Sequence, residues 1–151
     1  MINVAGGWCG GNCASDDFIA NVDLALRQSV WTSAIAASVA AKKLASGGLF
    51  ILPGAAPVTD GGTSGMIAYG ASKAAVHHMN LSISDENGGL AEGNTSLCLA
   101  PVVLDTPMNR KFMSNADFRS VISRCDLSVR PVISHKLNLK CALAHGHRYH
   151  S

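Results

Sequence analysis

A tyrosine and a lysine stand four residues apart, at Tyr69 and Lys73, in a segment with helical propensity. Residues at this spacing lie on the same face of an α-helix. A phenol has a reference pKa of about 10, so it exchanges protons poorly at neutral pH unless a nearby cation favours the phenolate. Lys73 is such a cation, and its three N–H donors can also bind a sugar diol. The pair predicts proton-transfer chemistry, and an ordinary surface pair on a helix is the alternative interpretation.

Two further stretches flank this segment. Upstream, residues 3–12 (NVAGGWCGGN) indicate a strand end that runs into a glycine-rich turn; downstream, residues 101–111 have the sequence PVVLDTPMNRK. With the Tyr69 segment between them, in this order and spacing, the chain resembles the short-chain dehydrogenase/reductase superfamily. Within that superfamily it is similar to the dihydropteridine reductases, a resemblance that also includes residues 28–33 (QSVWTS). The resemblance covers residues 1–120.

Predicted strands and helices alternate along the chain. Residues 1–5 end a buried strand, a long helix runs from about Phe18 to Ala45 after the N-cap candidates Asp16 and Asp17, and the Tyr69 helix continues to about Ser84. Residues 49–52 and 96–100 are short apolar runs, typical of strands buried on both faces. This order predicts an α/β fold with right-handed crossovers. By resemblance it is a partial Rossmann-like, doubly wound parallel sheet, the C-terminal half of a short-chain dehydrogenase/reductase domain.

The resemblance also implies what precedes residues 1–5 in such a domain. There, two βα units carry the glycine-rich phosphate loop and the acidic residue that binds the adenosine ribose. Neither is present in the 151 residues. We therefore expect residues 1–120 to be a truncated domain with weak or no activity on its own. The preference between NADH and NADPH also depends on that acidic or basic residue.

Residues 121–151 differ in composition from the rest. They carry five Lys or Arg against one Asp, whereas residues 1–120 carry seven Lys or Arg against nine Asp or Glu. They also hold four of the six histidines and show no sustained hydrophobic periodicity. Imidazoles can bind zinc, copper or nickel, but incidental histidines in a chain end are the simpler interpretation. We expect a divergent, poorly ordered basic tail and no metal site.

Composition excludes several other classes of protein. With 48% hydrophobic and 15% charged residues, the chain is typical of one globular domain. Its longest apolar run is shorter than the ~20 residues of a membrane span, and no signal peptide is recognisable. Five cysteines without framework spacing favour reduced thiols. We expect a soluble, cytoplasmic protein with neither a membrane nor a nucleic acid as partner.

The resemblance implies a reaction and the residues that carry it. The reaction is the reduction of quinonoid dihydropterin to tetrahydropterin with NADH or NADPH. Tyr69 would donate a proton, and Lys73 would bind the nicotinamide ribose and lower the phenol's pKa. The backbone of Ala5, Gly6 and Gly7 would pass close to the cofactor, where side chains must be small.

Three further positions are implied in the same way. Pro101 and Thr106 would border the nicotinamide carboxamide. Trp8 would lie at the pterin pocket, where an aromatic face suits a flat heterocycle. A buried tryptophan in the core is the alternative interpretation of Trp8.

Departures from the superfamily pattern separate the competing functions. Ala56 replaces the serine thirteen residues before the tyrosine, and Ser29 replaces an asparagine of the long helix. Both favour a pteridine reductase over a generic short-chain carbonyl reductase, because a ketone depends on that serine for orientation. Leu26 stands where the dihydropteridine reductases tend to have tryptophan, which places the details of the pocket in doubt.

A third hypothesis concerns assembly. The long helix and the Tyr69 helix form the subunit contact in the resembled family, which implies a homodimer. The same helices could let a non-catalytic fragment pair with a full-length reductase subunit.

Overall fold

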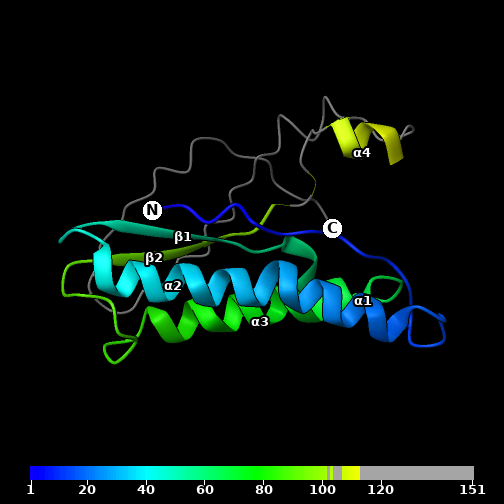
Figure 1. Cartoon of the computed structure of the whole chain (residues 1–151), viewed down its shortest axis with the longest axis horizontal. Coiled ribbons are helices and arrows are strands. Elements are labelled where there is room, and N and C mark those ends of the chain that lie inside the picture. The colour runs from blue at the N-terminus through cyan, green and yellow to red at the C-terminus, as the bar shows by residue number, and fades with distance from the viewer. Residues whose placement is uncertain (102, 104–106, 113–151) are drawn as a thin grey trace, which may run out of the picture.

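The computed structural model describes residues 1–101, 103 and 107–112, which form a layer of helices on a short parallel sheet (Figure 1). Two strands, β1 (Leu49–Pro53) and β2 (Thr95–Leu99), pair in parallel. The helices in chain order are α1 (Phe18–Ala25), the π-helical segment η1 (Leu26–Trp31), α2 (Thr32–Lys43), the 3-10 turn η2 (Ala56–Val58), α3 (Ile67–Ile83) and α4 (Pro107–Phe112). The α/β fold class expected from the sequence is confirmed.

The N-terminal residues add a third parallel stretch beside β1. The Asn3 amide donates to the Ile51 carbonyl at 2.9 Å, and the Ile51 amide donates to the Met1 carbonyl at 3.0 Å. The predicted strand end is present as an isolated parallel bridge between Ile2 and Ile51, and the predicted burial of this stretch is wrong. Ile2 and Val4 are largely exposed, because α2 and α3 cover the other face of the sheet (Figure 1).

The expectation that β1 is buried on both faces is also wrong, because helices cover one face of the sheet. The sequence predicted a strand buried on both faces, whereas only Phe50 and Leu52 are fully buried and Leu49 is exposed. Phe50 and Leu52 pack with Val76 of α3 and Ala40 of α2 to form the core. Alternate residues of a strand point to opposite faces, so one face of β1 is apolar core.

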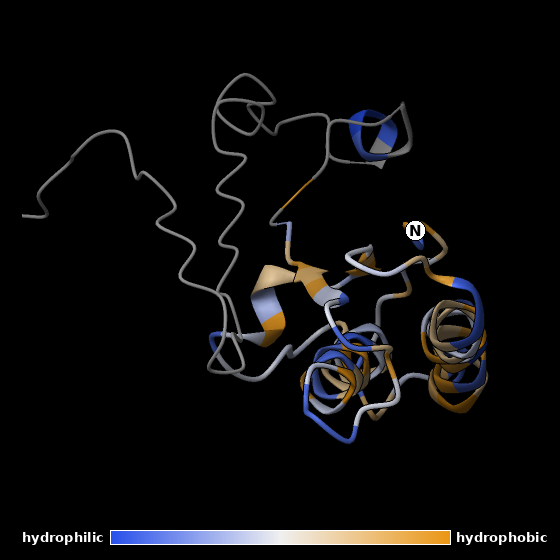
Figure 2. Ribbon diagram, turned by 90° about the vertical axis from the view of Figure 1, so that its left-hand side faces the viewer, coloured by the Kyte–Doolittle hydropathy of each residue, from blue (hydrophilic) through white to orange (hydrophobic). Residues whose placement is uncertain are grey.

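The long helix was predicted over Phe18 to Ala45 and runs from Phe18 to Lys43. It is interrupted by the π-helical turn η1. Asp17 stands at the N-cap, as predicted, but its side chain makes no capping hydrogen bond. The long helix lies beside α3 (Figure 2), and small Ser29 is fully buried on η1, the segment that packs on α3. Ser33 of α2 is also buried, and its Oγ accepts from the Asn3 side-chain amide at 3.3 Å.

The start of α3 is joined to the glycine-rich N-terminal turn. The Gly11 amide donates to the Gly65 carbonyl at 2.8 Å, and the Ile67 amide donates to the Gly11 carbonyl at 3.3 Å. Gly65 has a φ of +81°, a conformation that glycine adopts without strain. These bonds fix where the helix that carries Tyr69 and Lys73 begins.

None of the helices within the described ranges is both long enough and apolar enough to span a bilayer.

Candidate active site

Lys73 is the centre of the candidate site. Its side chain projects from α3, is only 5% exposed, and donates from Nζ to the Pro53 carbonyl at the end of β1 at 2.8 Å. A Cβ atom added to Gly6 would lie 3.1 Å from Lys73 Nζ. Three segments distant in sequence therefore meet at this ammonium, and even a Cβ atom at residue 6 would crowd it.

Tyr69 lies one helical turn before Lys73, on the same face, as the spacing predicted. Lys73 Nζ is 5.9 Å from the centre of the Tyr69 ring. The expectation that Lys73 lowers the phenol's pKa is wrong in this structure, because burial of the phenol raises the pKa of Tyr69. The ammonium is directed to the Pro53 carbonyl. Tyr69 is therefore a neutral phenol at neutral pH, suited to donate a proton.

Burial shifts the pKa of Lys73 and the pKa of the nearby Cys98 in opposite directions. Burial lowers the pKa of Lys73 itself, and the nearby Cys98 opposes this shift. Burial also raises the pKa of the Cys98 thiol to about 11, against the opposing effect of Lys73. A thiol with so high a pKa is protonated at neutral pH and is a poor nucleophile. Cys98 is thus part of the packing around the site.

Contacts within the chain hold the glycine-rich turn. The Ala5 amide donates to the Asn3 side chain at 3.0 Å, which holds the strand end. A Cβ atom at Gly7 would lie 1.8 Å from Gln28 Oε1, so a larger residue there would displace the Gln28 side chain. Gly7 therefore lacks a side chain where the Gln28 side chain packs.

Trp8 is 67% exposed, so the alternative interpretation of it as a core residue is wrong. Its ring edge lies against Gly10, where an added Cβ would be 2.9 Å from the ring. The exposed ring is available to a flat ligand.

Pro101 lies beside the turn after β1, because its carbonyl accepts from the Ala56 amide at 3.0 Å. Thr106 and the predicted tail over 121–151 lie outside the described residues.

The structure places Ser29 near Gly6 and Lys73, a position that the sequence did not predict. It lies in the π-helical turn η1, is fully buried, and its Oγ has no hydrogen-bond partner. The Cβ atom that, added to Gly6, would lie 3.1 Å from Lys73 Nζ would also lie 3.9 Å from Ser29 Oγ. π-helical turns are frequent at functional sites, but no residue pattern in the sequence indicated one here.

In the described ranges, no group of three or more His, Cys, Asp or Glu side chains is placed to bind a metal.

The sequence and the fold are similar to those of known reductases. No family model matches the chain. The chain is 51% identical over 118 residues to a dihydropteridine reductase of Dictyostelium discoideum; the match covers 78% of this chain and 51% of that relative. A short-chain dehydrogenase from Burkholderia cenocepacia, solved in complex with NADP, superposes with a TM-score of 0.62 at 29% identity, over 71% of this chain and 42% of that one. A blue fluorescent protein from a metagenomic library, solved with NADPH, has the same TM-score and coverage at 25% identity.

The fold is that of part of a short-chain dehydrogenase/reductase domain, with a tyrosine and a lysine on α3 at the ends of its parallel strands. Among the short-chain dehydrogenases/reductases, the enzyme that this sequence resembles is dihydropteridine reductase. The chain spans about half the length of that relative.

The pKa of Tyr69 provides the first prediction. Because the folded protein buries the phenol, its protonated form should persist to a higher pH, and the midpoint should lie above the reference value of about 10. The measurement is NMR titration of ring-labelled tyrosine, with Tyr69→Phe to assign the signal. Since burial is the cause, Lys73→Met should change the midpoint little. A midpoint below that of free tyrosine would show that the cation controls the phenol after all.

Proposed function

We propose that this site serves the NADH- or NADPH-dependent reduction of quinonoid dihydropteridine to tetrahydropteridine. The observation that carries the proposal is the buried Lys73 ammonium beside the side-chain-free Gly6, with the neutral phenol of Tyr69 one turn away. Support comes from the 51% identity to the Dictyostelium reductase and from the NADP and NADPH complexes of the structural neighbours.

Lys73 and the glycine-rich turn would hold the nicotinamide half of the cofactor. One N–H of the ammonium donates to Pro53, which leaves two donors for ribose hydroxyls. Because Gly6 has no side chain, the ribose could approach Nζ from that side. Pro101 and Thr106 would border the carboxamide. When bound, the reduced nicotinamide would supply the hydride.

Tyr69 and Trp8 would act on the pterin. The raised pKa keeps Tyr69 protonated, so it can donate a proton as negative charge develops on the substrate. The exposed ring of Trp8 offers a face on which a flat heterocycle can stack. Ala56, in η2, brings no hydroxyl to orient a ketone, which makes a generic carbonyl reductase the weaker proposal.

The reductase proposal is tested in a chimaera, in which the matched 118 residues of this chain replace their counterparts in the Dictyostelium enzyme. We expect turnover of quinonoid dihydropterin with NADH or NADPH. Tyr69→Phe and Lys73→Ala should each lower turnover by about 10- to 1,000-fold, through loss of proton donation and of cofactor positioning. The assay is the oxidation of the reduced cofactor at 340 nm.

Lys42→Ala is the matched control, because Lys42 is an exposed lysine near the end of α2 and should keep full activity. Full kcat in both Tyr69→Phe and Lys73→Ala would show that the site is wrongly assigned. A folded chimaera that reduced simple ketones and left the dihydropterin unchanged would favour the carbonyl reductase instead.

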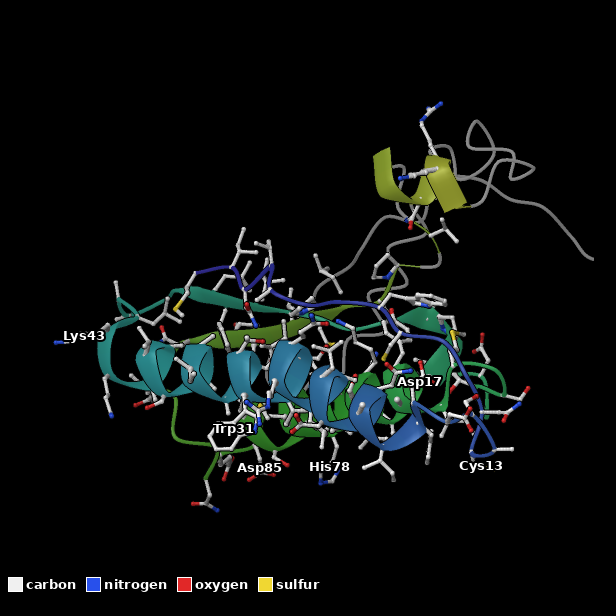
Figure 3. All side chains as sticks on the ribbon, turned by 45° about the vertical axis from the view of Figure 1, so that its right-hand side comes forward. Cys13, Asp17, Trp31, Lys43, His78 and Asp85 are labelled. Carbon is white, nitrogen blue, oxygen red and sulfur yellow. The ribbon has the colours of Figure 1, made fainter. Side chains whose placement is uncertain are left out.

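We further propose a homodimer formed through the long helix. Large apolar side chains on this helix are exposed, among them Trp31 at 65% and Ile35 at 61%. Figure 3 shows Trp31 on the side of the helices away from the strands. Exposed apolar surface on a helix is typical of a protein interface. The same face would serve the alternative function, a non-catalytic chain that pairs with a full-length reductase subunit. A cytoplasmic location, where free cysteines stay reduced, completes the proposal.

Sedimentation velocity tests the dimer. We expect twice the chain's mass for the unaltered protein and a monomer for Trp31→Ser combined with Ile35→Ser, because both changes remove apolar contact area. Glu86→Ser is the control, since Glu86 is exposed in the turn after α3 and does not belong to the long helix. A monomeric unaltered protein at micromolar concentration would contradict the dimer. Co-elution with the tagged Dictyostelium enzyme would support the pairing alternative.

A further inference from the structure

His77 lies one helical turn after Lys73 on α3, and it binds the turn that follows β1. The Ala55 amide donates to His77 Nε2 at 3.1 Å. Ala55 is fully buried, so its N–H depends on a partner within the protein. The acceptor comes from the same helix that carries the Tyr69 and Lys73 pair.

Lys73 and His77 bind this turn on either side of Gly54. The Pro53 carbonyl accepts from Lys73 Nζ at 2.8 Å, and two residues later the Ala55 amide donates to His77. Between them, a Cβ atom added to Gly54 would lie 2.5 Å from His77 Nε2 and 2.6 Å from Cys98 Sγ. The turn backbone is therefore packed directly against α3 and β2, and a small shift of the turn would move the carbonyl that orients Lys73.

We propose that His77 is a positioning residue: its neutral imidazole holds the turn over 53–55 in place, so that the Pro53 carbonyl orients the Lys73 ammonium toward the cofactor. The role of Lys73 toward the cofactor rests on the proposed function. The role of His77 in holding the turn rests on the hydrogen bonds alone.

The neutral form is required, because an imidazolium would direct an N–H at the N–H of Ala55. The ionisable groups that face His77 are Lys73 on its own helix and the Cys98 thiol of β2. Burial lowers the pKa of His77, the contact with the Ala55 backbone opposes this shift, and the Lys73 charge adds to it; the net pKa is lowered, which favours the neutral ring.

Two variants separate the hydrogen bond from the packing of the side chain. His77→Leu removes the acceptor, and His77→Gln replaces it with an amide oxygen at similar reach. His78→Leu is the matched control, because His78 is the next residue of α3 and is exposed. In the purified chain, we expect hydrogen exchange of the Ala55 amide to quicken by about tenfold or more in His77→Leu, while His77→Gln and His78→Leu stay close to the unaltered protein. The Cε signal of Lys73 should shift in His77→Leu alone.

Nitrogen-15 NMR of the unaltered chain tests the same point without a variant, should His77→Leu fail to fold. We expect the tautomer with a bare Nε2 at pH 7. An Nε2–H tautomer, an imidazolium, or unchanged Ala55 exchange in a folded His77→Leu protein would overturn the proposal. None of these readouts depends on cofactor binding. A chain that passes them and whose chimaera lacks reductase activity would refute the proposed function and leave the positioning role standing.

Discussion

The buried ammonium of Lys73 is the constraint on which the site depends. A lysine side chain removed from water is costly unless its charge is compensated by hydrogen bonds. The Pro53 carbonyl provides one such bond, and it can do so only if the end of β1 and the middle of α3 are held at a fixed distance. The core contacts of Phe50 and Val76 set that distance, because one belongs to β1 and the other to α3. Stability and site geometry therefore share the same contacts.

The glycine-rich N-terminal turn completes the arrangement. Its bonds through Gly11 to the start of α3 bring Gly6 beside Lys73. A residue without a side chain at this point lets the turn backbone pack against the ammonium, and the surroundings of Lys73 exclude most water. An environment of this kind strengthens the interaction of a cation with ligand oxygens, since fewer water molecules compete.

Much of this arrangement could be predicted from the sequence, because it depends on local patterns. The spacing of Tyr69 and Lys73 gave their common helical face, and the apolar runs gave β1 and β2 to within a residue. One-sided burial of β1 and the π-helical turn could not be predicted, because both depend on which elements pack where. The pKa of Tyr69 was predicted in the wrong direction, since the spacing shows the neighbouring charge but not the burial of the phenol, which causes the shift. His77 illustrates the same limit: its helical spacing from Lys73 was visible, but its contact with Ala55 arises only in the folded chain.

The most direct test of the account is NMR of Lys73 and Tyr69 during titration with the two halves of the cofactor. If the site binds the nicotinamide half, reduced nicotinamide mononucleotide should shift the Lys73 Cε signal and the Tyr69 ring signals. Lys73 lies beside Gly6, and Tyr69 lies one helical turn before Lys73. Adenosine diphosphate alone should leave both unchanged. If millimolar nicotinamide mononucleotide moved neither signal in the folded chain, Lys73 and Tyr69 would not form a cofactor site, and the central claim would be wrong.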